Sequence, residues 1–140
     1  MTQAIAYLSF NGNCAEAMRF YEQALRGKLE VLMSGAESPM KEHYTAENGH
    51  RILHARLALP GGGTLFAGDC PQHLPYEGIK GVSMAVDYPT VEEAGEVFAA
   101  LSAGGQVTMP MQPAFWAKSW GMLVDKFGTP WIVNGEVLPY

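Results

Sequence analysis

The chain has 140 residues, of which 48% are hydrophobic and 16% are charged. This composition suits one compact domain, or two small halves packed together, and excludes a disordered chain. A formal net charge of −5 argues against nucleic acid as a partner, because binding to a phosphate backbone depends on clustered Lys and Arg.

The first residues of the chain bear on where in the cell the protein is expected. Residues 1–10 have neither the basic segment nor the long apolar core of a signal peptide, and no later window approaches the roughly 18 apolar residues of a membrane helix. We therefore expect a cytoplasmic protein with no membrane partner. Cys14 and Cys70 lie far apart and outside a C-x-x-C motif, so both are expected to be free thiols.

The first half of the chain predicts one helix and four strands. Asn13 is a good N-cap, and Glu16 follows at the spacing of a capping box, so a helix is expected over residues 14–25. The polar connection 34–49 is expected to be either mobile or a lid. Apolar runs bounded by turn residues predict strands over 5–10, 29–33, 51–59 and 64–67.

The strand 51–59 shows the clearest alternation. Its odd-numbered residues from Leu53 to Leu59 are apolar, whereas His54 and Arg56 lie on the opposite face. One face is therefore expected to be packed and the other partly polar. Pro60 and the three glycines after it predict a turn that pairs this strand with the next one.

The same order of elements then begins again. Residues 71–80 are rich in Pro and Gly and are expected to be a linker. Thr90 and Glu93 repeat the capping-box spacing before a helical apolar pattern that ends at Leu101. Strands are expected over 81–86 and 107–109, and in a closing hairpin. The repeat predicts an α+β fold, a single domain of two βαβββ modules that span about 1–70 and about 81–140.

The closing hairpin is formed by DKFGTPWIVN, two apolar runs around a tight turn. Asp125 is expected to accept hydrogen bonds from the turn backbone, and Gly128 to take a positive φ. Pro130 is tolerated only at the first residue of a strand or on an edge. Each of these residues is therefore expected to have a backbone role.

Three segments together resemble a known family. FNGNCAEAMRFYEQAL after the first strand, FWAKSWG, and the closing DKFGTPWIVN resemble the PhnB-like branch of the vicinal oxygen chelate superfamily, which includes glyoxalase I, bleomycin and fosfomycin resistance proteins and extradiol dioxygenases. The resemblance implies two βαβββ modules whose strands form a cupped mixed sheet around one cleft. Many members are homodimers, so self-association is expected here.

Catalytic members of the superfamily bind a divalent metal through one residue on each of strands one, four, five and eight. The corresponding positions in this chain are Tyr7, Phe66 or Ala67, Val82 and Ile132. Only the phenol could be a ligand, and phenols are uncommon ligands for hard divalent ions, so no metal is expected. No cofactor is expected either, because no strand is followed by a glycine-rich loop and a helix.

Several residues are candidates for acid–base or anion-binding roles. His54 could be a base, and Arg56 an anchor for an anionic substrate. Alternatively, the two side chains are a half-buried pair whose polar groups bond to the backbone, to a carboxylate or to a dimer interface. Asp69 could orient a thiolate of Cys70. Alternatively, Asp69 accepts backbone N–H groups where its strand ends, and Cys70 is simply a small apolar residue. Tyr7 is the third acid–base candidate.

Aromatic residues are the candidates for a ligand wall. Phe115, Trp116 and Trp120 are close together in a segment that also carries polar residues. The two tryptophans could therefore either line a pocket or pack in the core. Met84 could line the same cleft or fill the core, and Trp131 is expected in the core. The remaining histidines lack ligand spacing and are expected at the surface: His43, His50 and His73.

Two functions fit these residues. The first is binding or sequestration of a small molecule, anionic or aromatic, without a metal. The second is a lyase- or isomerase-like reaction in the same cleft, with His54, Asp69 or Tyr7 as acid and base. A domain that acts only through protein partners is a third hypothesis.

Overall fold

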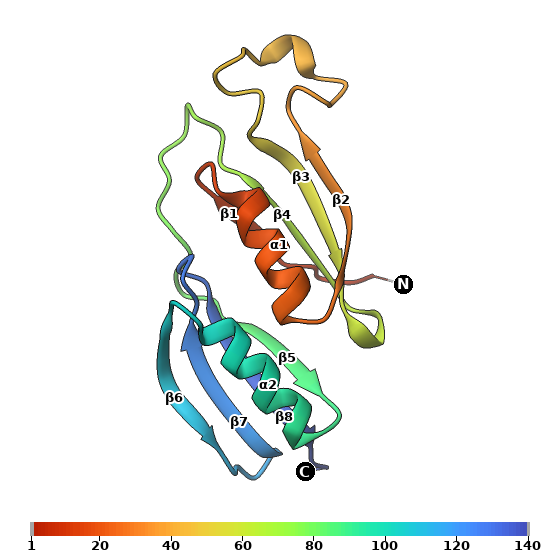
Figure 1. Cartoon of the computed structure of the whole chain (residues 1–140), viewed down its shortest axis with the longest axis vertical. Coiled ribbons are helices and arrows are strands. Elements are labelled where there is room, and N and C mark those ends of the chain that lie inside the picture. The colour runs from red at the N-terminus through yellow and green to blue at the C-terminus, as the bar shows by residue number, and fades with distance from the viewer. Residues whose placement is uncertain (1, 140) are drawn as a thin grey trace. The chain divides into compact units, whose positions relative to one another are not determined.

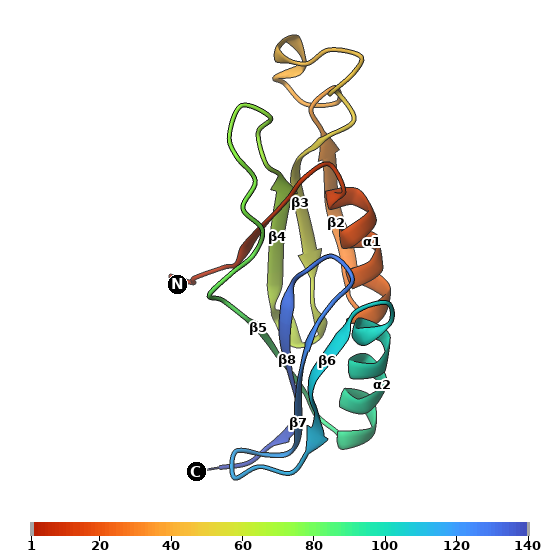
Figure 2. The same ribbon diagram turned by 90° about the vertical axis from the view of Figure 1, so that its left-hand side faces the viewer.

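The computed structural model describes residues 2–139. It divides into two compact units, Met1–Gly78 and Ile79–Tyr140, so the boundary falls within the segment 71–80. Each unit has the order βαβββ and carries its helix on one face of its own four-stranded sheet (Figures 1 and 2). The α+β class and the tandem βαβββ order predicted from the sequence are confirmed.

The first unit contains β1 (Tyr7–Phe10), α1 (Cys14–Ala24), β2 (Lys28–Ser34), β3 (Ile52–Ala58) and β4 (Thr64–Asp69). The strand order is β1-β4-β3-β2; β1 runs parallel to β4, and the other neighbours are antiparallel. The core lies between α1 and the sheet, where apolar side chains from both are fully buried: Phe10, Met18, Tyr21, Leu25 and Leu57.

The start of α1 differs from the sequence prediction. Asn13 makes no side-chain capping bond, and its carboxamide oxygen accepts instead from the N–H of Asn11 at 3.3 Å. The carboxylate of Asp69 caps the helix instead, because its Oδ1 accepts from the N–H groups of Gly12 at 2.8 Å and Cys14 at 3.1 Å. A charged acceptor at a helix N-terminus is a stronger cap than an amide.

The connection between β2 and β3 is built on a hairpin. The N–H of Gly35 donates to Arg51 O at 2.9 Å, and that of Ala36 donates to Gly49 O at 3.0 Å, so the pairing continues beyond both strands. A 3₁₀ helix, Lys41–His43, turns the chain at its far end. Some polar groups of this connection bond to each other; for example, Thr45 donates its N–H to Asn48 Oδ1 at 2.7 Å.

The second unit repeats this plan with β5 (Met84–Tyr88), α2 (Val91–Ser102), β6 (Gln106–Gln112), β7 (Ala117–Val124) and β8 (Pro130–Val137). Its strand order is β5-β8-β7-β6, with β5 parallel to β8. The hydroxyl of Thr90 accepts from the N–H of Glu93 at 3.1 Å, as predicted for the cap of α2. Its core residues include Val97, Leu101, Leu123, Trp131 and Val133.

Strand β6 is longer than the three residues expected from the sequence. It contains Pro110, whose missing N–H argues against a central strand. Because β6 lies at the end of the strand order, Pro110 can face away from β7 without breaking a ladder bond. Strand β5 begins at Met84 rather than at Gly81.

The closing turn between β7 and β8 is built as predicted. Asp125 Oδ1 accepts from the N–H groups of Phe127 at 2.8 Å and Thr129 at 3.1 Å. Its Oδ2 accepts from the indole N–H of Trp131 at 2.8 Å, so one buried carboxylate joins the turn to the core. Gly128 has a φ of 92°.

Within residues 2–139, neither α1 nor α2 has the length and apolar character needed to cross a membrane.

Candidate functional site

The face of the first sheet that α1 does not cover carries an aromatic cluster. Tyr7 pairs with Phe66, and Phe66 with Arg56, so these three side chains lie in one row across β1, β4 and β3. His54, two residues from Arg56, places its ring 5.9 Å from that of Tyr7 and 5.2 Å from that of Phe66. Tyr7 is 51% exposed, so the cluster is open to solvent at one edge.

Tyr7 is held as a neutral phenol. Its hydroxyl donates to Leu53 O at 3.2 Å, and its side chain lies across Gly68, where a Cβ would come within 2.8 Å of the hydroxyl oxygen. Burial and the nearby Cys14 raise the pKa of Tyr7 above its usual value. A phenol with a raised pKa cannot serve as a base near neutral pH.

Asp69 has a structural role. In addition to the two N–H groups at the start of α1, its Oδ2 accepts from the N–H of Ile52 at 2.7 Å. One carboxylate therefore joins the end of β4 to α1 and to the start of β3. This matches the backbone-accepting alternative considered for Asp69, because three amides occupy the oxygens that a base would need.

Arg56 is already engaged by a carboxylate. Its Nε lies 3.1 Å from Glu30 Oε1, and the guanidinium stands 5.9 Å from the centre of the Phe66 ring. Both charged side chains are about half exposed. A ligand anion would have to compete with Glu30 for this guanidinium, and the anchor role of Arg56 stays a prediction.

The second sheet carries two indoles in contact on the face that α2 does not cover. Along β7, Ala117, Ser119 and Leu123 are buried, whereas Trp116 and Trp120 belong to the opposite, half-buried set. The two indole rings are 5.0 Å apart at an interplanar angle of 54°. We call this pair the indole platform. Phe115, 72% exposed, meets Trp116 edge to face at 4.9 Å.

A chain of hydrogen bonds holds the indole platform. The Trp116 indole N–H donates to Asn134 Oδ1 at 3.2 Å, and the Asn134 amide donates to Asp87 Oδ1 at 2.9 Å. Asn134 also lies opposite Trp120 in the ladder. Sequence reasoning missed Asn134 and Asp87, although the alternation after the buried Trp131 places Asn134 on the open face.

Two other predicted site residues lie elsewhere. Met84 pairs with the buried Trp131, so it belongs to the face of the sheet covered by α2 and does not share a face with the indole platform. His54 is in the first unit, whereas the tryptophans are in the second.

The metal-equivalent positions do not form a metal site. Tyr7 pairs with Phe66, which settles the strand-four position in favour of Phe66. Ile132 pairs with Ala85, whereas Val82 precedes β5. These positions offer one phenol, and residues 2–139 hold no group of three or more His, Cys, Asp or Glu side chains able to bind an ion. The donor set therefore does not fit the divalent metal of the catalytic members.

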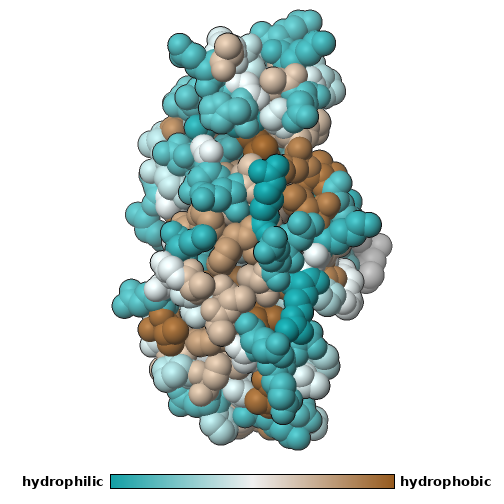
Figure 3. All heavy atoms as spheres, viewed as in Figure 1, coloured by the Kyte–Doolittle hydropathy of each residue, from teal (hydrophilic) through white to brown (hydrophobic). Residues whose placement is uncertain are grey.

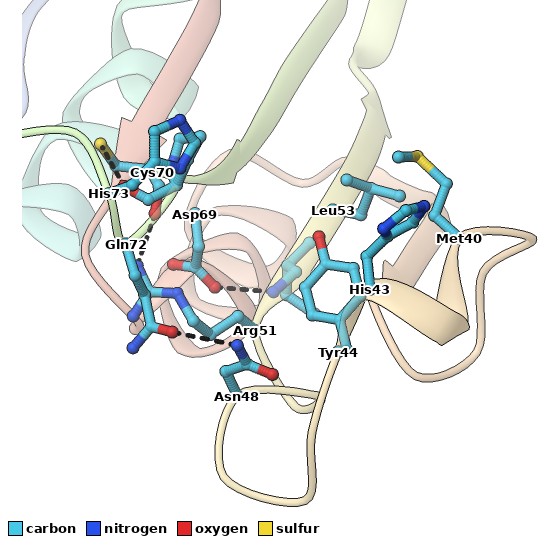
Figure 4. Close-up of a pocket in the computed structure, with 12 residues that line it drawn as sticks. Met40, His43, Tyr44, Asn48, Arg51, Leu53, Asp69, Cys70, Gln72 and His73 are labelled. Atoms are coloured by element: carbon cyan, nitrogen blue, oxygen red, sulfur yellow. Dashed lines mark hydrogen bonds between the residues drawn. The ribbon is translucent and has the colours of Figure 1, made fainter.

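A pocket of about 370 Å³ lies within the first unit, between the β2–β3 connection and the segment that follows β4 (Figure 4). Arg51 stands in it, and its Nη2 donates to Cys70 O at 2.6 Å. Asn48 Nδ2 donates to Gln72 Oε1 at 3.1 Å and links the two walls. The lining also includes Met40, His43, Tyr44, Ile52, Leu53, Asp69, Pro71 and His73.

Sequence reasoning missed this pocket. His43 and His73 are exposed, as predicted, but both also line the pocket. Their segments lack a hydrophobic period, and no local pattern shows that positions about 30 residues apart meet. The one hint in the sequence was the length and polar character of the 34–49 connection.

Comparison with known proteins identifies the family. A model of the Glyoxalase/Bleomycin resistance protein/Dioxygenase superfamily matches residues 5–133, and the chain belongs to this superfamily. It is similar to PA1353 from Pseudomonas aeruginosa, a crystal structure with 43% identity over 96% of this chain and 97% of that chain and a TM-score of 0.86.

Two further relatives indicate the branch. The PhnB protein from Bacillus cereus is 25% identical over 95% of this chain and 98% of its own, with a TM-score of 0.74. Protein YjdN of Escherichia coli K12 is 32% identical over 136 residues, which is 91% of each chain. The PhnB-like branch predicted from the sequence motifs is thereby confirmed.

Proposed function

We propose that the protein binds a small planar organic molecule, without a metal, on the indole platform of the second sheet. The observation that carries this proposal is the half-buried pair of indoles, Trp116 and Trp120, packed 5.0 Å apart on a sheet face without a helix. Large aromatic surfaces are usually buried, and two indoles packed against each other provide a large, rigid contact area at little entropic cost.

The polar groups beside the indole platform suit a ligand that forms hydrogen bonds. Asn134 and Asp87 lie in the same row of the sheet as Trp120 and can offer both donors and acceptors. Lys118 is paired with Glu136 at 2.9 Å, so its charge is balanced on the protein. The platform therefore gives no reason to prefer an anion, in contrast to the sequence hypothesis that relied on Arg56.

The enzymatic alternative has weaker support. Asp69 and Tyr7 are committed to backbone groups, which leaves His54 as the remaining acid–base candidate. Within residues 2–139, His54 makes ring contacts but no hydrogen bond or ion pair that would orient it as a base. General acid–base catalysis usually relies on a positioned partner, so binding fits these contacts better.

The test is a tryptophan-fluorescence screen of planar heteroaromatic compounds, followed by calorimetric titration of the hits. Trp120→Ala should weaken a hit by on the order of 1 kcal/mol, about fivefold in Kd, because stacking adds to area burial. Trp116→Phe should also weaken it, since the bond to Asn134 is lost.

Two variants in the first unit serve as controls for this screen. Phe66→Leu removes an aromatic ring from the open face of the first sheet and should leave the affinity unchanged. Arg56→Ala tests the anchor role directly. Unchanged affinity in both tryptophan variants, with a loss in Arg56→Ala or Phe66→Leu, would move the site to the first sheet.

A further inference from the structure

We propose that the pocket of the first unit binds a small organic oxyanion, a carboxylate or a phosphate monoester, on Arg51. This site is independent of the indole platform. The central observation is a half-buried guanidinium that faces a cavity and, within the described part of the chain, has no carboxylate at ion-pair distance. The guanidinium stays charged at all physiological pH values.

The contacts of Arg51 leave part of its donor capacity free. Its Nη2 donates to two neutral acceptors, Cys70 O at 2.6 Å and Asn11 Oδ1 at 3.4 Å. A guanidinium has five N–H donors arranged in a planar fork that matches two oxygens of one anion. Burial of a charge with only neutral partners is unfavourable, so an anion in the pocket would complete the site.

Asp69 also lines the pocket but does not neutralise Arg51. Both of its oxygens accept backbone N–H groups, from Gly12, Cys14 and Ile52. In Figure 4, a dashed line joins one oxygen of this carboxylate to a backbone nitrogen, the N–H of Ile52. The three amide dipoles and the N-terminus of α1 compensate this negative charge, and the positive charge of Arg51 is left for a ligand.

The rest of the lining defines the size and chemistry of the ligand. Asn48, Gln72 and the imidazoles of His43 and His73 add polar groups to the lining, and Asp69 is the only carboxylate among the lining residues. Met40, Leu53 and Pro71 add apolar surface for a short organic body. A volume of about 370 Å³ is at the small end of ligand pockets. Hydrophilic side chains prevail at this end of the first unit (Figure 3).

Isothermal titration calorimetry with four probes tests this site on the full chain. Benzoate and phenyl phosphate carry an oxyanion on an aromatic body, benzamide is a neutral isostere of benzoate, and inorganic phosphate lacks the body. We expect benzoate or phenyl phosphate to bind at least tenfold more tightly than benzamide, because charge-assisted bonds to a guanidinium are strong. Inorganic phosphate should bind more weakly than phenyl phosphate.

Variants identify the residues responsible. Arg51→Gln should weaken oxyanion binding at least tenfold, and Arg51→Lys, which keeps the charge but loses the fork, should weaken it less. Arg19→Gln removes an exposed arginine of α1 and is the matched control, with affinity within twofold of wild type. Because Arg51 also supports Cys70, His43→Ala provides a second test on an exposed residue; its oxyanion affinity should fall several-fold.

Three results would overturn the proposal. They are equal affinities for benzoate and benzamide, unchanged oxyanion binding in folded Arg51→Gln or in His43→Ala, and no binding of any probe at millimolar concentration. Trp120→Ala should leave oxyanion binding intact. Loss of the indole-platform ligand in Trp120→Ala tests the proposed function, whereas loss of the oxyanion in Arg51→Gln tests the pocket. Either proposal can therefore fail without the other.

Discussion

The carboxylate of Asp69 replaces an N-cap residue that the sequence places at Asn13. It reaches the start of α1 from the end of β4, 55 residues away from Cys14 in the chain. A capping interaction that spans this distance couples the formation of the helix to the formation of the sheet. Asp125 couples two parts of the fold over a shorter stretch of chain. One of its oxygens accepts from the closing turn, and the other accepts from the indole N–H of Trp131 in the core.

Asp69→Asn should therefore destabilise the protein more than Asn13→Ala. The carboxamide in this variant has a single acceptor oxygen and cannot serve both Ile52 and the start of α1, so we expect a loss of about 2 kcal/mol in the free energy of unfolding. Within residues 2–139, the side chain of Asn13 bonds only to the N–H of Asn11, and its removal should cost less than about 0.5 kcal/mol. Urea denaturation of both variants measures the difference, and a larger loss in Asn13→Ala would contradict this assignment.

The two cysteines should differ in reactivity. Burial, together with the charge of Asp69, raises the pKa of the Cys14 thiol to about 12. Cys70 is half-exposed and lines the pocket. A thiol reagent such as DTNB at pH 8 should modify one cysteine per native chain and two in denaturant, and a Cys70→Ser variant should react only when unfolded. Native labelling of Cys14 would disprove the difference.

The raised pKa of Cys14 also predicts an alkaline loss of stability. The folded thiol holds its proton to about pH 12, compared with an ordinary value of 9.0, so the folded state binds more protons between these values. The associated stability is fully present below pH 9 and is lost as pH rises toward 12, at about 1.4 kcal/mol per pH unit. Urea denaturation from pH 8 to 10.5 should show a shallower decline in Cys14→Ala than in wild type.

At the scale of elements, two glycines are expected to respond to alanine with opposite signs. Gly128 has a φ of 92° in the closing turn, and Gly95 lies in α2; a Cβ would meet no atom within 4 Å at either position. Gly128→Ala should therefore cost about 1 kcal/mol from backbone strain alone. Gly95→Ala should stabilise the protein by about 0.5 to 1 kcal/mol, because alanine favours a helix. Thermal unfolding distinguishes the two signs.

The elements themselves were predicted well where the signal is local. The order of helices and strands, the cap of α2 at Thr90 and the closing turn all depend on residues within a few positions of one another. The ends of β5 and β6 were not predicted, because strand ends depend on the partner strand. Pro110 shows this: its place in β6 is acceptable only because β6 is an edge.

At the scale of the whole molecule, we predict a homodimer. The superfamily resemblance motivates this prediction, and β6 adds a physical reason, because it is an edge strand whose Val107 and Met109 are 44% and 37% exposed. Exposed apolar edges favour association with another chain. Sedimentation equilibrium at micromolar concentration should give twice the chain mass of 15.2 kDa. A single species at the chain mass would contradict it.

Sequence alone determined the tandem βαβββ order, the α+β class and the family, because hydrophobic period, turn residues and motifs are properties of neighbouring positions. Tertiary structure decided the sites. Strand order and register brought Asp87 to Asn134 and Trp116, and placed Arg51 beside Cys70, over separations of 18 to 47 residues. Such contacts depend on which strands pair and on which face each residue points, and no local pattern in the sequence carries that information.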